Sequence, residues 1–312
     1  MGSHEQVAGS RVGIVGGSIA GCAAALALQR LGADVEVYER SSGVLRDRGS
    51  GIAIPIALRD ELIDTGYLDA DYAHCSAQRR WWVLADGTES GRVLWEQPGT
   101  AALNNWGVLW RSLRSRVPDG RYHDGISLRS FTATGDGVHV DLSDGTSRTV
   151  DVLVGADGYR SEIRHRLVPD ARLEYAGYIL WRGNYPERRL THRDAIDRGD
   201  ADGAWHTVCF DGGHGVVYMI PDFDDRATIG HRRVNWAIYA PQPEGMDFDD
   251  PTSVAPGDVN DDDYRALDHL LTESFPPDYE AIIRATPVDE VSIQPIYDEV
   301  VDSYVHGPVL LI

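Results

Sequence analysis

The 312-residue sequence predicts an α/β fold in which a Rossmann-like βαβ domain is interleaved with a domain built on an antiparallel sheet. Two observations predict this class. Near the N-terminus, residues 11–40 have the pattern strand, glycine turn, helix and strand, which is typical of a βαβ unit. Between residues 205 and 239, short aromatic-rich segments alternate with turns, which is typical of antiparallel strands.

The βαβ unit begins with an apolar, β-branched run at Val12–Val15, followed by Gly16 and Gly17. Small and apolar residues then recur at helical spacing up to Leu31, and a second strand ends at Glu39. A glycine turn lets backbone N–H groups approach a pyrophosphate, and the helix N-terminus favours that anion. The terminal acid can accept a hydrogen bond from a ribose hydroxyl, so the stretch predicts a site for an adenine dinucleotide.

One position departs from the G-x-G-x-x-G spacing of such turns. The motif runs from Gly16 to Gly21, with Ser18 in place of the second glycine. A serine there narrows the approach to the phosphate, but its hydroxyl can cap the helix or donate a hydrogen bond. An ordinary tight βα turn is the alternative interpretation.

A second turn of the same kind lies at residues 149–166, TVDVLVGADGYRSEIRHR. An apolar strand there runs into Asp157 and Gly158, and Ser161 begins a helix, so this loop can also approach a ligand. A common Asp-Gly turn is the plainer interpretation, although the complete string is far more specific than that pair.

Composition narrows the class of protein. The net charge is −20 and lysine is absent, so nucleic acid and anionic membrane are poor partners. The missing amine excludes a Walker A ATPase and pyridoxal-phosphate or Schiff-base chemistry. No apolar run is long enough to span a membrane, and three scattered cysteines indicate neither disulfides nor a metal site, so a cytoplasmic protein is expected. The carboxylate surplus favours a halophilic interpretation, although a GC-rich genome would also replace lysine by arginine.

The patterning also predicts the remaining elements. Helices are expected at residues 55–66, 103–117, 264–275 and 279–285. Strands are expected at 81–95 (a hairpin turning at Asp86-Gly87), 126–132, 138–142, 152–154, 205–210, 215–220, 227–231, 234–239 and 309–312. The acidic stretch 241–263, rich in proline and glycine, is expected to be an exposed loop.

Taken together, these residues resemble the group A FAD-dependent aromatic monooxygenases of the p-hydroxybenzoate hydroxylase superfamily, over essentially the whole chain. The segments GGSIAG, YAGYILWRG, GHGVVYMIP and RVNWAIYA are most similar to the 2,6-dihydroxypyridine 3-hydroxylase and 6-hydroxynicotinate hydroxylase types. The resemblance implies a discontinuous FAD-binding domain (residues 1–78, 104–172 and 288–312) and a substrate domain (residues 79–103 and 173–287).

The resemblance also implies which residues bind the cofactor. The first motif holds the ADP half of FAD, and a helix arginine contacts FAD. The Asp-Gly motif serves both FAD and the transient nicotinamide nucleotide, and a further loop passes beside the isoalloxazine. The positions that match are Gly16, Gly17, Ser18, Gly21, Glu39, Arg40, Gly51, Ile52, Arg111, Asp157 and Gly158.

The implied reaction is hydroxylation of an electron-rich hydroxylated aromatic or N-heteroaromatic (pyridine-type) ring. NADH or NADPH reduces the flavin, and O2 then forms a C4a-hydroperoxide that attacks the ring. The protein positions the ring, excludes water and supplies a base. His214 and Tyr218 match the family's G-H-x-x-x-Y segment and lie on the same face of an extended strand, so they are the candidate catalytic pair. A turn histidine beside a core tyrosine is the alternative.

Three further side chains have weaker indications. His206 is a second candidate base. Arg182 is a candidate partner for an anionic substrate or a nucleotide phosphate, with a structural ion pair as the alternative. Trp205 is one of several aromatic residues that could wall a flat ring, although core packing is the favoured explanation for each of them. A homodimer is the candidate assembly.

The resemblance finally raises an expectation about the end of the chain. A third family signature, Gly-Asp followed by small residues and proline, comes directly after a strand like HGPVLLI, whereas this sequence ends at Ile312. The chain is therefore expected to be truncated at its C-terminus and to bind FAD poorly. Two alternatives stay open: an NAD-dependent Rossmann oxidoreductase, and a non-catalytic fragment of the flavoenzyme.

Overall fold

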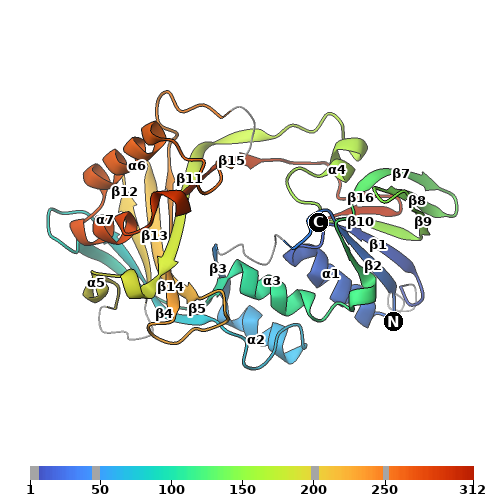
Figure 1. Ribbon diagram of the computed structural model, residues 1–312, viewed down its shortest axis with the longest axis horizontal. Coiled ribbons are helices and arrows are strands. Elements are labelled where there is room, and N and C mark those ends of the chain that lie inside the picture. Colours follow the sequence, from blue (N-terminus) through green and yellow to red (C-terminus); the bar gives the residue numbers. More distant parts are fainter. Residues whose placement is uncertain (1–6, 44–49, 198–203, 249–252) are drawn as a thin grey trace.

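The computed structural model describes residues 7–43, 50–197, 204–248 and 253–312. In this part of the chain two large sheets stand at opposite ends of the long axis (Figure 1). Helix α3 (Trp106–Arg114) lies between the two sheets on one side, next to β3 (Gly51–Pro55), the edge strand of the second sheet. On the other side, strands β11 (Glu174–Pro186) and β15 (Ser292–Asp298) of the second sheet reach toward the first sheet.

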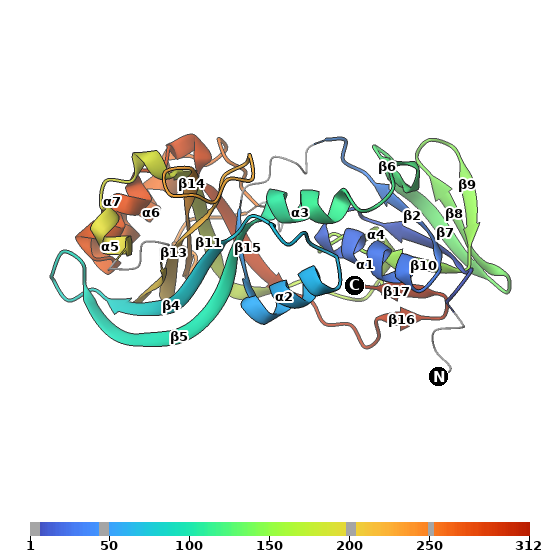
Figure 2. The ribbon, with the colours of Figure 1, turned by 90° about the horizontal axis from the view of Figure 1, so that it is seen from below.

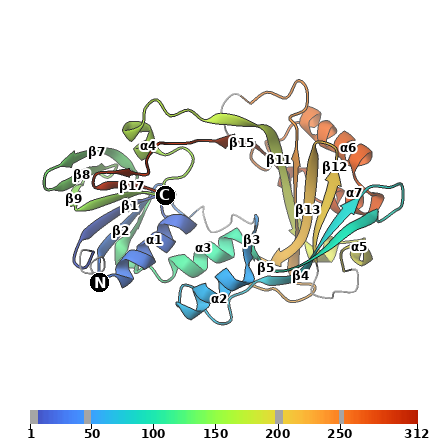
Figure 3. The ribbon, with the colours of Figure 1, turned by 180° about the vertical axis from the view of Figure 1, so that it is seen from behind.

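The first sheet has six strands in the order β16-β17-β10-β1-β2-β6. Strands β1, β2, β6, β10 and β17 run parallel, whereas β16 is antiparallel to β17. Their bounds are β1 Arg11–Val15, β2 Asp34–Glu39, β6 Tyr122–Asp124, β10 Val152–Gly155, β16 Val305–His306 and β17 Val309–Leu311. The C-terminus lies close to the start of α1 (Ile19–Arg30) (Figure 3). Because β1, α1 and β2 follow one another and the two strands pair in parallel, the βαβ unit expected at residues 11–40 is confirmed.

Helices α1 and α3 pack against one another and against this sheet. Buried Cys22, Ala25 and Leu26 form one face of α1, and they meet Val108 and Leu109 of α3. Small residues on α1 let it approach the sheet closely, which is the usual reason for such a composition in a βαβ helix.

The second sheet has eight strands in the order β15-β11-β14-β13-β12-β4-β5-β3. Its pairs are antiparallel except for the parallel contact between β12 and β4. The remaining bounds are β4 Cys75–Leu84, β5 Arg92–Asn105, β12 Trp205–Phe210, β13 Gly213–Pro221 and β14 Arg232–Ala240. Strands β4 and β5 form a long curved hairpin, and α2 (Ile56–Asp64) lies beside the lower end of the sheet (Figure 2).

One face of the second sheet carries the larger hydrophobic core. Helices α6 (Asp261–Ser274) and α7 (Pro277–Arg284) cover it. The fully buried side chains there include Trp181, Trp236 and Tyr279. Helix α5 (Arg193–Asp197) and the 3-10 turns at residues 187–189 and 288–290 complete this end of the molecule.

A third, three-stranded sheet packs on the outer side of the first. It contains β7 (Leu128–Thr134), β8 (Gly137–Leu142) and β9 (Ser147–Val150), with α4 (Glu162–Leu167) beside it. Val138, Val140 and Leu153 are buried in their common core. The strands expected at residues 126–132 and 138–142 are therefore present with small shifts of their ends.

Three element predictions were wrong, at residues 103–105, at residues 227–231 and at the end of the acidic stretch 241–263. Residues 103–105 are strand rather than the start of a helix, because Leu103 and its neighbours pair with both β3 and β4. Residues 227–231 form turns rather than a strand. That segment belongs to a loop fixed by side chains, as described below. The acidic stretch expected to be a loop up to residue 263 ends earlier, because Asn260 caps α6 by accepting from the N–H groups of Asp262 and Asp263. Residues 249–252 of that stretch lie outside the described residues.

Among the described residues, none of the helices combines the length and the apolar character needed to cross a membrane. Within the same residues, no group of three or more His, Cys, Asp or Glu side chains is arranged to hold a metal ion. Cys22, Cys75 and Cys209 are free thiols.

Candidate active site

The turn between β1 and α1 owes its shape to glycine. Gly16 has a φ of +103°, and a Cβ placed there would lie 2.1 Å from the carbonyl oxygen of Ala156. A Cβ on Gly21 would lie 1.8 Å from the carbonyl oxygen of Gly16. A side chain at either position would push the turn away from α1 or from the loop after β10. The glycines therefore allow the two turns to touch.

Both turns line one cavity of about 830 Å³. The first turn contributes Gly16 and Ser18, and the second contributes Asp157 and Gly158. Helix α1 begins at this cavity, and its first turn has no acidic residue, so the positive end of the helix is available to an anion. The two motifs that the sequence indicates therefore meet in a single groove.

Ser18 occupies the N-cap position of α1, but its side chain makes no capping hydrogen bond. The expectation that this hydroxyl caps the helix is therefore wrong. The residue lines the cavity instead, and a hydrogen bond from Ser18 to a ligand stays a prediction.

Glu39 closes the same groove at the end of β2. One carboxylate oxygen accepts from the N–H of Gly17 at 2.7 Å, and the other accepts from the N–H of Ser41 at 2.8 Å. The residue is only 6% exposed, yet it lines the cavity. Because a carboxylate oxygen has a second lone pair, Glu39 can hold the turn and also accept from a ribose hydroxyl.

Asp157 orders the second turn. Its carboxylate accepts from the hydroxyl of Ser161 at 2.5 Å and from the N–H of Glu162 at 2.8 Å, and Ser161 accepts from the N–H of Arg164 at 3.0 Å. These bonds satisfy the free N–H groups at the start of α4. Gly158 has a φ of +80°, and no atom lies within 4 Å of a Cβ placed there, so the loop presents open backbone to the cavity.

The groove fits the ADP part of FAD on these observations. Its volume lies within the range of small-molecule sites, and the N-terminus of α1, whose first turn has no acidic residue, faces it. Glu39 supplies a buried acceptor at one wall. Arg40 also lines the groove and adds a positive charge.

Strand β3 connects this groove with the second sheet. The N–H of Gly51 donates to Oδ1 of Asn235 at 2.8 Å. A Cβ on Gly51 would lie 2.7 Å from the phenol oxygen of Tyr218 and 2.5 Å from Nδ2 of Asn235, so only glycine fits here. The neighbouring Ile52 packs against the core of the first sheet. The structure thus brings the expected flavin-side loop directly against the expected catalytic tyrosine.

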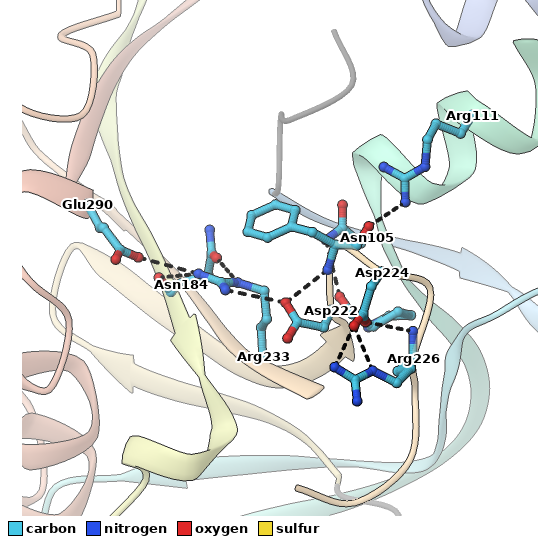
Figure 4. A network of polar contacts seen from close by, with 10 residues as sticks. Asn105, Arg111, Asn184, Asp222, Asp224, Arg226, Arg233 and Glu290 are labelled. Atoms are coloured by element: carbon cyan, nitrogen blue, oxygen red, sulfur yellow. Dashed lines mark hydrogen bonds and ion pairs between the residues drawn. The ribbon is translucent and has the colours of Figure 1, made fainter. Parts of the chain in front are cut away.

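Arg111 has a different environment from the one expected. Its guanidinium donates to the carbonyl oxygen of Phe223 at 2.8 Å and forms an ion pair with Asp225. Figure 4 shows Arg111 reaching from α3 toward the loop that carries Asp222 and Asp224. Asp225 has a φ of +64°, so this loop is held in a conformation that few non-glycine residues adopt. Contact between Arg111 and FAD stays a prediction.

His214 and Tyr218 lie on the same face of β13, as their spacing predicts. The His214 ring stacks on Tyr239 with centroids 4.7 Å apart, and Tyr218 meets Trp205 edge-on at 5.9 Å. Burial, together with the positive charge of Arg80, lowers the pKa of His214. Burial raises the pKa of Tyr218, although Arg182 opposes this.

His206 lies on the opposite face of the second sheet. One ring nitrogen is 2.8 Å from the hydroxyl of Tyr279 and the other is 2.8 Å from the carbonyl oxygen of Ile196, and the side chain is fully buried. Its ring therefore joins β12 to α7 and α5. Its candidacy as a base is wrong, because the ring is fully buried beneath the helices, on the face of the sheet opposite to His214 and Tyr218.

A second cavity, of about 1070 Å³, adjoins the first and shares Arg40, Ser50, Tyr159, Arg160 and Arg182 with it. Arginine dominates its polar lining, although the chain as a whole carries a net charge of −20. The arginines are Arg40, Arg160, Arg182, Arg188, Arg189 and Arg233. Such a concentration of positive charge favours an anionic ligand.

Comparisons with known proteins match two parts of the chain to domain families and most of the chain to aromatic monooxygenases. The family model described as an NAD(P)-binding Rossmann-like domain matches residues 14–45, and the model described as FAD binding domain-like matches residues 175–296. The 2,6-dihydroxypyridine 3-monooxygenase of Paenarthrobacter nicotinovorans is 29% identical over 97% of this chain and 75% of that protein. The solved structure of 2,6-dihydroxypyridine-3-hydroxylase from Arthrobacter nicotinovorans has a TM-score of 0.83, with 28% identity over 97% of this chain and 76% of the other.

The chain is a relative of the group A FAD-dependent aromatic monooxygenases. A further relative, the 6-hydroxynicotinate 3-monooxygenase of Pseudomonas fluorescens, is 28% identical over 56% of this chain and 48% of that protein. The chain thus spans about three quarters of the first of these monooxygenases and about half of the second.

Several residues of this monooxygenase relative were not among the expected site residues. Arg80, Asn235 and Tyr239 lie on the polar face of the second sheet, beside His214 and Tyr218. Arg188, Arg189 and Arg233 belong to consecutive arginine pairs, a signal that the sequence contains. Nothing in the local pattern shows which arginines turn toward a cavity, because that depends on which strands become neighbours.

Proposed function

We propose that this protein catalyses the FAD- and NAD(P)H-dependent hydroxylation of an electron-rich hydroxylated aromatic or pyridine-type ring. The observation that carries the proposal is the single groove shared by the Gly16 turn and the Asp157 loop, with β3 leading from it to Tyr218. Relatives that hydroxylate dihydroxypyridine and hydroxynicotinate support the same reaction class.

In this proposal the groove of about 830 Å³ holds FAD, which when bound supplies the redox and oxygen chemistry. The start of α1 faces the pyrophosphate, and Glu39 accepts from the ribose. Gly51 brings the backbone of β3 beside the flavin ring without a side chain in the way. In this proposal the first and third sheets belong to the FAD-binding domain and most of the second sheet belongs to the substrate domain, although β3 and β15 of the second sheet lie in the segments assigned to FAD binding.

His214 acts as the base in this proposal. Because its pKa is lowered, the imidazole is neutral at pH 7 and a ring nitrogen can accept the proton of a substrate hydroxyl. Tyr218 keeps its proton because burial raises its pKa, so its hydroxyl can donate to a substrate oxygen. Deprotonating the ring makes it more electron-rich, which favours electrophilic attack.

The arginine-lined cavity of about 1070 Å³ is the proposed site of the nicotinamide nucleotide. Its volume suits a dinucleotide, and guanidinium groups bind phosphate oxygens with bidentate geometry. Since Arg40, Arg160 and Arg182 line both cavities, a nucleotide in the second cavity would lie next to one in the first.

The test is a titration of the purified protein with FAD, followed by flavin fluorescence and absorbance. We expect saturable FAD binding that is weak, in keeping with the expectation from the sequence, and we expect added hydroxypyridine to accelerate NAD(P)H oxidation together with O2 uptake. Glu39→Gln should weaken FAD binding about tenfold or more, because the amide disturbs the bond to Gly17. Glu36→Gln is the matched control, since Glu36 lies on the same strand but does not itself line the groove; its carboxylate accepts from the hydroxyl of Tyr38 at 2.7 Å.

No binding of FAD together with saturable binding of NAD would overturn the proposal and favour a dehydrogenase. Equal weakening by Glu39→Gln and Glu36→Gln would instead contradict the placement of the ADP half.

A further inference from the structure

Arg80 lies on β4, on the same face of the second sheet as His214 and Tyr218. Its guanidinium lies between two indole rings, 4.2 Å from the centroid of Trp82 and 4.3 Å from that of Trp205. Its Nε donates to the hydroxyl of Thr207 at 2.8 Å. This stacking fixes the plane of the guanidinium and directs its remaining N–H groups.

The charge of Arg80 is not neutralised by a carboxylate within the described residues. The contrast is with its neighbour Arg79, which is paired with Glu96 at 2.8 Å on the surface. The chain contains 49 acidic and 29 basic side chains, so an arginine without an acidic partner is informative. Burial lowers the pKa of Arg80, which shows the cost of holding this cation away from water.

Arg80 lines a third cavity, of about 280 Å³, which is separate from the two nucleotide-sized cavities. The volume is at the lower end for small-molecule sites and suits one substituted ring. Its walls are mainly apolar, and Gln97 is the uncharged polar side chain that lines it together with Arg79 and Arg80. The amide oxygen of Gln97 accepts from the indole N–H of Trp82 at 3.1 Å and so helps to hold the ring under Arg80.

The third cavity adjoins the candidate catalytic pair. Trp205 lines it and contacts Tyr218 edge-on. Strand β3 starts at Gly51, against Tyr218, and its other end, Ala53–Pro55, lines the cavity. Arg80 is itself near enough to His214 for its charge to lower the pKa of that histidine. The third cavity and the catalytic pair therefore share Arg80, Trp205 and β3 as neighbours.

We propose that Arg80 binds an anionic substituent of the aromatic substrate, a carboxylate, and so selects hydroxylated aromatic or pyridine carboxylates over neutral ring diols. This inference rests on the proposed function, because it assigns the substrate class of the same site. The guanidinium forms two N–H···O bonds to the carboxylate, the ring packs on the apolar wall, and the ring hydroxyl faces His214 and Tyr218.

The test uses acid and amide pairs of equal shape: 4-hydroxybenzoate with 4-hydroxybenzamide, and 6-hydroxypyridine-3-carboxylate with its amide. Binding is followed by quenching of tryptophan fluorescence, because two of the indoles flank Arg80. We expect each acid to bind about 10- to 100-fold more tightly than its amide. Arg80→Gln should abolish this preference, and Arg80→Lys should retain part of it.

Arg79→Gln is the matched control, since Arg79 also lines the cavity but is 54% exposed and paired with Glu96. Equal affinity for acid and amide in the wild-type protein, or no detectable binding of either pair, would overturn the proposal. So would an equal loss of preference in Arg79→Gln and Arg80→Gln. Circular dichroism and the melting temperature verify that each variant is folded.

The fluorescence titration needs no flavin, so the two proposals can fail separately. A protein that prefers the acids but does not bind FAD would retain the Arg80 site and lose the monooxygenase assignment. A protein that binds FAD and hydroxylates the amides as readily as the acids would retain the assignment and lose the Arg80 site.

Discussion

The pKa values of the two candidate catalytic side chains, His214 and Tyr218, are shifted in opposite directions by the same buried environment. Burial favours the neutral form of every titratable group, so it lowers the pKa of His214 and raises that of Tyr218. The nearby cations Arg80 and Arg182 each lower the pKa of their neighbour, so Arg80 adds to the effect of burial on His214, whereas Arg182 opposes the effect of burial on Tyr218. Near neutral pH the site therefore contains a free base beside a protonated phenol.

This tuning predicts the pH dependence of activity. As pH rises, kcat/KM should increase through a pKa below 6.5 and then level off, because the neutral imidazole is the active form. His214→Gln should reduce kcat/KM by about 10²- to 10⁴-fold and abolish the rise of kcat/KM with pH on the acid side. The measurement is substrate-stimulated NAD(P)H oxidation from pH 5 to 9.

The control for this prediction is His139→Gln, an exposed histidine on β8. A His214→Gln variant that binds FAD and retains the wild-type profile would show that another group accepts the proton.

At the scale of elements, local patterns predicted most helices and strands but not their partners. The strand–turn–helix motifs at Gly16 and Asp157 are encoded by residues a few positions apart, so the sequence reveals them. Leu103, by contrast, becomes a strand residue because β3 and β4 pair with it from 50 and 28 positions away. Residues 227–231 have a strand-like pattern, yet the adjoining loop is fixed by Arg111 from α3.

The residues of the candidate site also fall into two groups: those that local motifs reveal and those that only the pairing of strands reveals. Gly16, Glu39, Asp157, His214 and Tyr218 stand in recognisable motifs, so the sequence indicates them. Arg80 stands in no motif. Its role emerges only when β12 aligns beside β4, which brings Trp205 and Thr207 to its guanidinium.

One buried ion pair organises several elements at the edge of the second sheet. Glu187 is fully buried and accepts from Arg232 of β14 at 2.8 Å, from Arg193 of α5 at 2.7 Å and from the N–H of Gly230 at 2.8 Å. Burial alone would raise the pKa of Glu187, but the hydrogen bonds from the two arginines outweigh it and lower the pKa to about 2. The ionised carboxylate is therefore part of the folded structure.

Glu187→Gln should lower the free energy of unfolding by about 3–5 kcal/mol, because it leaves the Arg232 charge buried without its partner. The depressed pKa also fixes the pH dependence. The stabilisation is complete above the ordinary glutamate pKa of 4.5 and is lost as pH falls toward 2, since protons then bind the unfolded chain more tightly. Urea unfolding at pH 7 and pH 4 measures both effects.

Glu273→Gln is the matched control, because Glu273 is 66% exposed and pairs only with a surface histidine among the described residues. A loss in Glu187→Gln no larger than in this control would show that the buried pair contributes nothing net.

At the scale of the whole molecule, the two sheets carry complementary parts of the chemistry, and the cavities lie where they meet. Arg40 and Tyr159, which follow β2 and β10 of the first sheet, and Arg182 of β11 in the second sheet line both nucleotide-sized cavities. The arginines gather there while carboxylates dominate elsewhere, as in the three aspartates that begin α6. The field of the molecule therefore repels anions from most of the surface and attracts them to the cavities.

This charge distribution leads to a prediction about salt. With a net charge of −20, repulsion between carboxylates destabilises the folded chain. Raising NaCl from 0.1 to 1 M shortens the Debye length from about 10 to about 3 Å and should raise the melting temperature by about 5 °C or more. A rise that is equal for NaCl and KCl and largely complete at 0.5 M reports screening. A melting temperature that is unchanged or falls would contradict the halophilic interpretation and leave genome composition as the reason why arginine replaces lysine.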